Sequence, residues 1–516
     1  MLIHEKQLTH YLQQYFDYDR FQEGQQEIIE DVLNGNDVLG ILKTGSGKSL
    51  CYQLPAKLLP GLTIVVSPLI SLMIDQVRQT KAFHFKEVVA LHSFQHRTER
   101  NHIIQQLERF KLVYISPELL QQRPLLHTLT TMDVRLFVID EAHCISQWGY
   151  DFRPDYLRLG AVIKTLANPP VLALTGTATK EVQQDIITML GRQQMKRHIY
   201  PMDRENISLL VHEVKEDEEN KVQILTNVLT TYHVPTIIYF SSRKMAEHIA
   251  QQLYIKLNDR KVAFYHGGMD TMDRLKIQQQ FMDDQLDIIC CTSAFGMGIN
   301  KKNIRFVIHY HLPTQIESYI QEIGRAGRDG DESVSLLLYE QGDIHLPLQI
   351  IENEMPSEAE IMFAANQLYH LYINKQEIPT KEDMIEQYFQ VNETKWRILH
   401  YQFESHGMIV HNQINYNHQL WTTSIQQMKQ FCTDRLVMKR KKVTEIYDWL
   451  VSTQCLRKQL YKRFQREVEQ KERQCCSNCG FSFSEWNPNE TAGKITVKEK
   501  LWQDQLASLL LIGESE

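Results

Sequence analysis

The sequence lacks any long apolar segment. Nowhere in its 516 residues is there a run of about 18 apolar residues, the length that a membrane-spanning helix needs. The first ten residues, MLIHEKQLTH, carry charged side chains where a secretory signal peptide needs an apolar stretch. These absences argue against a membrane or secreted protein and predict a soluble, cytoplasmic one without a membrane partner.

Cysteine is sparse and irregularly spaced, with nine residues in the chain. A secreted domain stabilised by disulfides would show a denser and more regular framework, so that class is disfavoured too. Cys51, Cys144, Cys290 and Cys291 lie in apolar or motif contexts that are typical of reduced thiols. Four of the others gather between residues 455 and 479 and differ from these in their spacing.

Positive charge is also in deficit. The formal net charge of −7 argues against a protein that simply coats nucleic acid, because phosphate binding depends on local positive charge. The average hides one basic region, since residues 435–473 contain twelve Lys or Arg and only five Asp or Glu. The basic part of the chain is therefore C-terminal.

The length and the alternating patterns predict several domains. A chain of 516 residues is too long for one hydrophobic core, so three or four domains are expected. In two successive regions, 1–205 and 206–345, short β-rich apolar runs alternate with segments of helical period, which predicts an α/β fold with a helix-covered parallel sheet in each. The runs are LTIVVSPL, KLVYISPELL, VRLFVIDEA and PVLALTGTAT, then VPTIIYFSS, KVAFYHGG, LDIICCTSA, IRFVIHYHLP and SVSLLLYEQ.

The stretch LKTGSGKSL has the context of a phosphate-binding loop, because it follows the strand-like DVLGI and precedes a helical segment. Gly45 and Gly47 would let backbone N–H groups approach the phosphates of ATP. Lys48 would reach the β/γ oxygens and Ser49 would ligate Mg²⁺. The strict pattern has Gly where Leu42 stands, so an ordinary Gly-rich turn is the alternative. The predicted nucleotide-binding residues of the loop are Thr44, Gly45, Ser46, Gly47, Lys48 and Ser49.

Two further motifs supply groups for hydrolysis. After the run LFVI, Asp140 is placed to hold the Mg²⁺ shell and Glu141 to polarise the attacking water. In QEIGRAGRDG, Arg325 and Arg328 lie three apart, and we expect them on one helical face, completing the ATP site from the second region. The alternative is a solvated basic helix end, but two glycines inside a helix would cost about 1 kcal/mol each without another use.

Several stretches together carry a family resemblance. They are FDYDRFQEGQQEII, SPLISLMIDQ, DEAHCISQWGYDFRPDY, AFGMGINKKNIRFVIHYHLP and QEIGRAGRDG. In these stretches the first 340 residues or so resemble the RecQ family of superfamily-two DNA helicases. The resemblance implies two tandem RecA-like lobes that close on ATP.

The resemblance also implies how the base is held. Tyr18 and Gln25 should contact adenine. The family usually has an Arg-Pro pair where Gln22 and Glu23 stand, so an arginine stacked on the base would have to be Arg20 instead.

The segment QWGYDFRPDY, directly after the DEAH motif, resembles the aromatic-rich coupling loop of the family. Bases of single-stranded DNA stack on aromatic rings at about 1 to 3 kcal/mol each. Trp148, Phe152 and Arg153 would therefore sense the strand and adjust the hydrolytic residues; the alternative is that the aromatic residues are core. By the same resemblance His143 bridges nucleotide and second lobe, and Ser67 of SPLISLMIDQ contacts the DNA backbone.

The accessory region begins with a winged-helix-like pattern, placed at 356–425. Residues 378–423 predict a helix, a turn, a second helix and two short strands around 412–415. Lys395, Arg397 and His400 on the second helix make DNA contact plausible, and a helical spacer without DNA contact is the alternative. Tyr416 and His418 are only candidates for a wing that splits duplexes.

A basic helical hairpin with zinc-type cysteines is placed at 430–485, followed by a tail, 486–516, to which no role is assigned. Its expected ligands are Cys455, Cys475, Cys476 and Cys479. The family commonly spaces its last three cysteines by two, but Ser482 occupies the final position here, and Cys475 is the substitute. Adjacent cysteines bind one metal awkwardly, so one of them could be free, with water or Asn478 intervening; a cluster without metal is a further alternative.

The combined prediction is an ATP- and Mg²⁺-dependent DNA helicase with structural Zn²⁺. By resemblance it moves 3′ to 5′ on single-stranded DNA, unwinds duplexes with single-stranded tails or forks, and acts in DNA recombination and repair. The tail leaves no room for the further C-terminal HRDC domain of longer members, so a short bacterial-type member is expected. The rivals are an RNA-directed remodeller and a DNA-binding scaffold with ATP as a switch. Cytoplasmic, nucleoid-associated localisation and contacts with repair or single-strand-binding proteins are expected.

Overall fold

The computed structural model describes residues 5–488 apart from 147–152, 216–219, 297–300, 380–381, 411, 466–467 and 469–474. The chain divides into two compact units. The second unit comprises residues 312–316 and 341–451, and the first contains the remainder. Among the described residues, no helix has both the length and the apolar character for a bilayer crossing.

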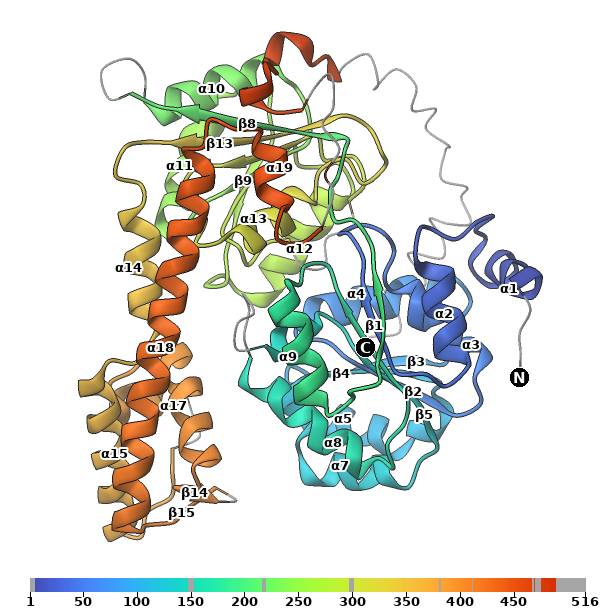
Figure 1. Cartoon of the computed structure of the whole chain (residues 1–516), viewed down its shortest axis with the longest axis vertical. Coiled ribbons are helices and arrows are strands. Elements are labelled where there is room, and N and C mark those ends of the chain that lie inside the picture. The colour runs from blue at the N-terminus through green and yellow to red at the C-terminus, as the bar shows by residue number, and fades with distance from the viewer. Residues whose placement is uncertain are drawn as a thin grey trace. The chain divides into compact units, whose positions relative to one another are not determined.

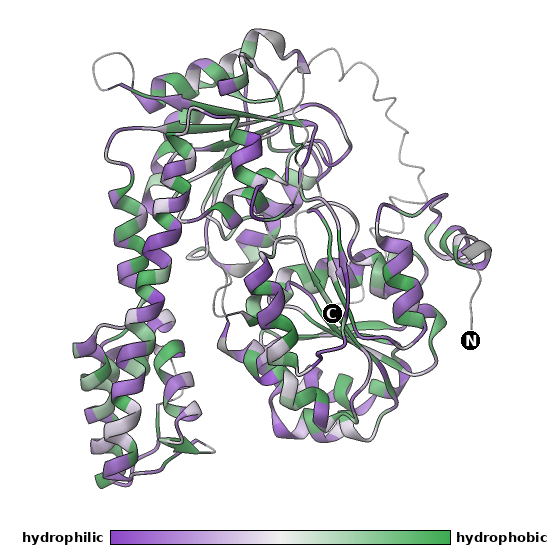
Figure 2. Cartoon of the chain, viewed as in Figure 1, coloured by the Kyte–Doolittle hydropathy of each residue, from purple (hydrophilic) through white to green (hydrophobic). Residues whose placement is uncertain are grey.

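The first sheet has seven parallel strands in the order β3-β4-β2-β5-β6-β1-β7. They are β1 (Val38–Ile41), β2 (Leu62–Val66), β3 (Val88–Leu91), β4 (Leu112–Ile115), β5 (Val134–Ile139), β6 (Val171–Thr175) and β7 (Lys196–Ile199). Most are continuous apolar runs, as expected of strands buried on both faces, and Figure 2 shows them as hydrophobic. The strands predicted from the β-rich runs of this region are confirmed.

Helices cover both faces of this sheet (Figure 1). They are α1 (Glu5–Phe16), α2 (Gln25–Leu33), α3 (Leu50–Leu58), α4 (Ile70–Ala82), α5 (Arg97–Gln105), α6 (Pro117–Leu120), α7 (Arg123–Thr130), α8 (Leu159–Thr165) and α9 (Lys180–Leu190), with short 3₁₀ turns at Leu107–Arg109, Ala142–Ile145 and Pro154–Arg158. Strand β6 lies between β1 and β5, so the loops that follow β1 and β5 open at the same edge of the sheet.

The second sheet has six parallel strands in the order β10-β11-β9-β12-β13-β8. They are β8 (Ile207–Glu213), β9 (Thr236–Tyr239), β10 (Val262–Tyr265), β11 (Ile288–Cys291), β12 (Phe306–His309) and β13 (Ser333–Tyr339), accompanied by α10 (Lys221–Thr231), α11 (Arg243–Lys256), α12 (Thr271–Met282) and α13 (Ile316–Ile323). The two RecA-like parallel-sheet lobes are thereby confirmed.

The end of the described chain completes the core of the second lobe. Phe481 and Trp486 are buried there, and the Trp486 ring lies 5.0 Å from that of Tyr232 and 5.6 Å from that of Phe306, centroid to centroid. Trp486, which the sequence placed at the start of an unassigned tail, therefore belongs to this core. Between the second unit and this segment lie α19 (Leu456–Tyr461) and the 3₁₀ turns Ser477–Cys479 and Phe483–Glu485.

The second unit contains α14 (His345–Glu354), α15 (Glu358–Ile373), α16 (Glu382–Phe389), α17 (Glu393–Ser405), the antiparallel pair β14 (Ile409–Val410) and β15 (Gln413–Ile414), and α18 (His418–Leu450). The predicted succession of two helices and two short strands is observed. Helices α14 and α18 run side by side (Figure 1).

Helix α18 is continuous through residues 425–430, so the domain boundary expected there falls inside one helix. No Gly or Pro interrupts it between His418 and Leu450, and Asn417 caps its first turn by accepting a hydrogen bond from Leu420 N. Residues 430–450, expected in the zinc-type hairpin, belong to the second unit, whereas the four cysteines belong to the first.

Candidate active site and metal centre

The loop between β1 and α3 is shaped by two glycines. Gly45 has a φ of 87° and Gly47 a φ of 72°, in the left-handed region that favours glycine. A Cβ on Gly47 would lie 2.8 Å from Nε2 of Gln25, and one on Gly45 would lie 3.1 Å from Cγ of Arg328. Larger residues would disturb both neighbours, so the loop has the close backbone approach that phosphate binding needs.

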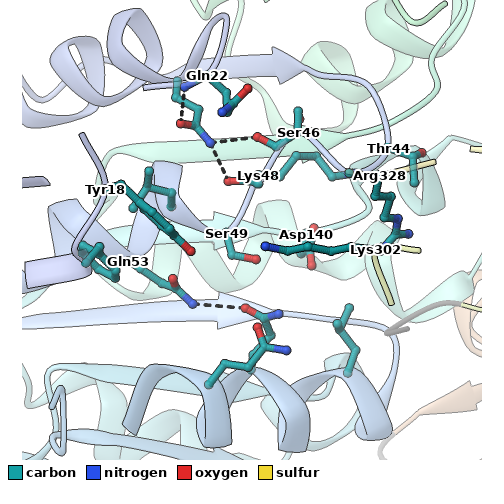
Figure 3. Close-up of a pocket in the computed structure, with 18 of the residues that line it drawn as sticks. Tyr18, Gln22, Thr44, Ser46, Lys48, Ser49, Gln53, Asp140, Lys302 and Arg328 are labelled. Atoms are coloured by element: carbon teal, nitrogen blue, oxygen red, sulfur yellow. Dashed lines mark hydrogen bonds between the residues drawn. The ribbon is translucent and has the colours of Figure 1, made fainter. Parts of the chain in front are cut away.

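A cavity of about 790 Å³ opens at this loop. Both lobes line it: Tyr18, Arg20, Gln22, Gln25, Thr44, Gly45, Ser46, Gly47, Lys48, Ser49, Asp140 and Glu141 come from the first, and Lys302, Gln321, Arg325 and Arg328 from the second. Every residue predicted for catalysis or for nucleotide binding is among them. Figure 3 shows Tyr18 on one side of the space and Arg328 on the other. The cavity is large enough for a nucleotide, and its cations suit a polyphosphate.

Two adjacent carboxylates follow β5 at the cavity wall. Glu141 has a φ of 49°, a left-handed conformation that costs a non-glycine residue about 1 to 3 kcal/mol and is typical of functional sites. Its backbone N–H donates to Oδ1 of Asp140 at 3.0 Å, and its Oε1 lies 3.6 Å from Nζ of Lys48. Its other carboxylate oxygen, Oε2, is buried and accepts no hydrogen bond within the described residues.

The two carboxyl groups have opposite pKa shifts. Burial, followed by the negative charge of Glu141, raises the pKa of Asp140 to about 7. Burial also opposes ionisation of Glu141, but the charges of Lys48, His143 and Arg325 lower its pKa overall. A divalent cation would offset the repulsion at Asp140, and carboxylate and hydroxyl oxygens are donors that Mg²⁺ prefers. Asp140, together with Ser49, therefore fits Mg²⁺.

Hydrogen bonds of His143 and Tyr156 support the chain around the two carboxylates. Nδ1 of His143 lies 2.8 Å from Oγ1 of Thr175 at the end of β6, and 3.4 Å from Oε2 of Glu141. The hydroxyl of Tyr156, which is 1% exposed, donates to the carbonyl oxygen of Asp140 at 3.2 Å. Tyr156 is thus a core residue beneath the carboxylates. His143 contacts the first lobe through Thr175, and its bridging role toward the second lobe stays a prediction.

The arginines reach the cavity from a turn. Helix α13 ends at Ile323, and residues 324–329 form successive turns, so the expectation that Arg325 and Arg328 share a helical face is wrong. The glycines of the motif explain this, because Gly324 ends the helix and Gly327 has a φ of 54°. Both side chains still line the cavity. Burial, followed by the charges of Arg325 and Arg204, lowers the pKa of Arg328 to about 9.

The base side of the cavity is formed by residues that precede α2 and begin it. The Tyr18 ring is 46% exposed at the cavity edge, and Arg20 is also exposed there. Gln25 donates through Nε2 to the carbonyl oxygens of Ser46 at 2.8 Å and Gly47 at 3.0 Å. Gln25 therefore ties this side of the cavity to the loop between β1 and α3, and its predicted contact with adenine stays a prediction.

The coupling loop is described only at its ends. Trp148 and Phe152 lie outside the described residues, so their predicted contact with DNA stays a prediction. Arg153 donates through NH1 to the carbonyl oxygen of Pro68 at 2.8 Å. Ser67, beside Pro68, is only 1% exposed at the end of β2. Its predicted contact with the DNA backbone also stays a prediction.

The three cations predicted to contact DNA in the second unit are each beside a carboxylate. Nζ of Lys395 lies 2.7 Å from Oε1 of Glu360, an Arg397 guanidinium nitrogen contacts Glu393, and Nδ1 of His400 lies 3.5 Å from Oε2 of Glu404. These carboxylates reduce the free positive charge of α17. DNA contact by this helix stays a prediction.

Four cysteines converge in the first unit. The Sγ atoms of Cys455, Cys475, Cys476 and Cys479 all lie within 4.8 Å of one another, and those of Cys455 and Cys475 are 3.7 Å apart. A hydrogen bond from Cys475 lowers the pKa of the Cys476 thiol and so favours a thiolate. Four converging sulfur ligands of this kind fit tetrahedral Zn²⁺.

The residues weighed as other ligands have different contacts. The side chain of Asn478 donates to the carbonyl oxygens of Ser452 at 2.6 Å and Gln454 at 2.8 Å, so it braces the turn around the cluster. The hydroxyl of Ser482 lies 2.6 Å from that of Ser484. Cys475 joins the cluster in place of a residue at position 482.

Sequence reasoning missed two residues at the cavity. Lys302 precedes β12 and is among the residues that line the cavity. Arg204 lies between β7 and β8 and donates to Thr44 O at 3.0 Å and to Gly324 O at 3.4 Å. Lys302 lies in the quoted stretch AFGMGINKKNIRFVIHYHLP, but nothing in its spacing places it at the cavity. Arg204 belongs to none of the quoted stretches, and its partners Thr44 and Gly324 are 160 and 120 positions away.

Comparisons with known proteins agree with this geometry. Residues 22–186 match the DEAD/DEAH box helicase family and residues 220–330 the helicase conserved C-terminal domain. The chain is 41% identical to the probable ATP-dependent DNA helicase RecS of Bacillus subtilis, over 98% of each chain. It is 43% identical to the ATP-dependent DNA helicase RecQ of Haemophilus influenzae, over 64% of this chain and 53% of that protein.

Solved structures resemble the fold at low identity. The Mycobacterium smegmatis helicase Lhr bound to single-stranded DNA and AMP-PNP has a TM-score of 0.56 at 18% identity, with 77% of this chain and 56% of that one covered. The DEAD-box helicase Mss116 bound to single-stranded RNA has a TM-score of 0.57 at 16% identity, with 86% and 90% covered. These likenesses establish the two-lobed fold alone. The sequence relatives lead to one conclusion: the chain belongs to the RecQ family of superfamily-two DNA helicases.

Proposed function

We propose that this ATP-dependent DNA helicase of the RecQ type moves 3′ to 5′ along single-stranded DNA, unwinds tailed or forked duplexes, and acts in DNA recombination and repair. One observation carries the proposal: Lys48 and Glu141 of the first lobe line the same cavity as Arg325 and Arg328 of the second. Hydrolysis at such a site is coupled to the distance between the lobes. The direction of movement rests on family membership.

The chain's own residues divide the work of hydrolysis. Backbone N–H groups between Gly45 and Ser49 hold the phosphates, and Lys48 offsets their charge. Asp140 and Ser49 would hold Mg²⁺, which would supply positive charge near the phosphate oxygens. Glu141 orients water and accepts its proton, for which its ionised state suits it.

The second lobe contributes charge that matters most as the γ-phosphoryl group leaves. Arg325 is buried and Arg328 is partly buried, and both lie in the turn of residues 324–329. Guanidinium groups held in place in this way stabilise developing negative charge with little reorganisation. After phosphate departs, this attraction falls and the lobes separate, which advances the enzyme on its strand.

We also propose that the four-cysteine cluster holds a structural zinc ion. The sulfur donor set and its convergence support this assignment. The metal would fold the segment around α19 onto the second lobe rather than take part in hydrolysis. A cytoplasmic, nucleoid-associated location, with contacts to repair or single-strand-binding proteins, belongs to the same proposal.

Replacing Glu141 with Gln should separate binding from hydrolysis. The amide keeps the size of the side chain but cannot accept the proton of water, so DNA-stimulated hydrolysis should fall about 100-fold or more while ATP affinity persists. Phosphate release and binding of a fluorescent ATP analogue measure the two. Glu118→Gln, on the exposed surface of α6, is the matched control. Unchanged turnover in Glu141→Gln would remove the assigned base.

Gln25→Ala should weaken ATP binding. The variant loses the hydrogen bonds to the carbonyl oxygens of Ser46 and Gly47, and losing such bonds in a buried site should raise KM for ATP by about tenfold. Steady-state hydrolysis measures KM. Gln26→Ala is the control, because the Gln26 side chain donates to Glu30 and not to the loop. Equal KM values for the two variants would contradict the role of Gln25.

The metal assignment predicts roughly one zinc per chain by elemental analysis. Cys479→Ser should lose that zinc, because a hydroxyl is a poor substitute for a thiolate ligand. Ser482→Ala should keep it, since Ser482 lies outside the cluster. Zinc that persists in Cys479→Ser but disappears in Ser482→Ala would mean that Ser482, and not Cys479, is a ligand. Carefully purified protein without zinc would return the cysteines to ordinary thiols.

Polarity can be tested with one fluorescent duplex that bears a 3′ DNA tail, a 5′ DNA tail or a 3′ RNA tail. We expect unwinding from the 3′ DNA tail alone and none by Lys48→Ala. Unwinding from the 5′ tail would overturn the direction, and efficient use of the RNA tail would favour an RNA-directed remodeller. Hydrolysis without unwinding would indicate a translocase or switch.

A further inference from the structure

Arg457 is a buried cation that the mechanism above does not use. It lies on α19, two residues after Cys455, and it is the largest fully buried side chain among the described residues, at 1% exposure. Its guanidinium forms an ion pair with Asp203 and donates to the carbonyl oxygens of Arg204, at 3.2 Å, and Ile207. A buried charge is tolerated only where such partners are fixed, so these contacts are specific.

The partners of Arg457 lie in the segment that joins the two lobes. Residues 200–206 run from the end of β7 in the first sheet to the start of β8 in the second. The segment is also held by Gln465, which follows α19 in the chain. The side chain of Gln465 accepts hydrogen bonds from the backbone N–H of Met202 at 2.9 Å and of Asp203 at 3.3 Å. Tyr461, one helical turn after Arg457, is 2% exposed.

The cysteine segment also holds the start of β8. The backbone N–H of Leu209 donates to the carbonyl oxygen of Cys475 at 3.1 Å, and that of Val211 donates to Oγ of Ser477 at 3.4 Å. Residues 202–211 are therefore fastened at both ends by the cysteine cluster and α19.

This segment contacts the ATP site through Arg204. Its guanidinium donates to Thr44 O in the phosphate loop at 3.0 Å. It also donates to Gly324 O at 3.4 Å, to Ala326 O at 3.2 Å and to Gly327 O, all in the turn that carries the two catalytic arginines. Arg204 thus joins the phosphate loop to the arginine turn, while Arg457 fixes the backbone on which Arg204 is carried.

We propose that Arg457 is a positioning residue for ATP hydrolysis, which fixes residues 203–207 so that Arg204 holds the phosphate loop and the arginine turn in register. The cysteine cluster thereby influences the geometry of the ATP site, although none of its four cysteines lines that cavity. This inference rests on the proposed hydrolysis at the two-lobed cavity. It assigns the cluster a part in turnover beyond folding its own segment.

The contacts predict a split between kcat and nucleotide affinity. Ground-state binding depends on the phosphate loop and on Gln25, with which Arg457 has no direct contact. Turnover needs the arginine turn in place, and misplacement of catalytic groups by as little as about 1 Å can cost 100-fold in rate. Arg457→Gln should lower kcat for DNA-stimulated hydrolysis by about tenfold or more, with the Kd for a non-hydrolysable ATP analogue within about threefold.

The matched control is Lys458→Gln, which removes an exposed cation from the next position of the same helix. Zinc content and thermal unfolding are measured for every variant. If Arg457→Gln fails to fold, Asp203→Asn and Arg457→Lys carry the test, because each keeps part of the contact set. Wild-type kcat in the folded, zinc-containing variants would overturn the proposal.

A double-variant comparison tests the route through Arg204. Arg204→Lys should show the same loss of kcat, and Arg457→Gln added to it should cause little further loss, because both act on one set of contacts. Losses that multiply would mean that Arg457 acts independently of Arg204 and would overturn the proposed route.

Hydrogen exchange gives a readout that needs no turnover. In full-length Arg457→Gln, amides of residues 202–209 and 324–328 should exchange faster than in wild type, and those of β2 and β4 should not change. Metal-free Cys479→Ser should show the same pattern. Unchanged exchange at 202–209 would refute the proposal. If wild-type protein hydrolyses no ATP, the proposed function fails, and the exchange pattern still decides whether Arg457 positions the segment.

Discussion

Two neighbouring carboxylates at the wall of one cavity are the constraint around which this enzyme is arranged. Asp140 is buried and the Glu141 side chain is 13% exposed at the end of β5, and like charges repel strongly where little water screens them. Lys48 lies within ion-pair distance of Glu141, and arginines of the other lobe line the same cavity. The balance of charge in the site therefore depends on both lobes. Separation of the lobes would change the charge around Asp140 and Glu141.

Much of this arrangement can be read from local sequence, because the signals are local. Buried parallel strands are short apolar runs, and the phosphate loop and the DEAH motif follow such runs directly, so strands, loop and carboxylates could be placed together. The cysteine set was also predictable from spacing and residue type. Strand β7, KRHI, has three polar residues among four and lacks the apolar signal of its neighbours.

Other features could not be predicted, because they depend on partners distant in the chain. Arg325 and Arg328 line the cavity as expected, but they lie in a turn and not in a helix, since Gly324 and Gly327 are compatible with either a close-packed helix or a turn. The sequence suggests that the cations of α17 are available for DNA. Glu360, which lies beside Lys395, is 35 positions earlier in the chain, so local sequence does not reveal the pair. Trp486 carries no local sign of its place in the second lobe, which depends on packing against Tyr232 and Phe306. Arg204 and Arg457 become meaningful only when the two lobes and α19 are seen together.

The position of β8 at the edge of its sheet has a consequence for the solubility of the protein. It is the last strand of its sheet. On its outer edge, the backbone N–H of Leu209 donates to the carbonyl oxygen of Cys475, and Leu209 forms a β-bridge with Cys476. An uncovered edge strand presents unpaired N–H and C=O groups that can recruit another chain. The cysteine segment thus covers part of an edge that could otherwise pair with another chain. Loss of the fold of this segment would expose that edge and make the molecules prone to edge-to-edge aggregation.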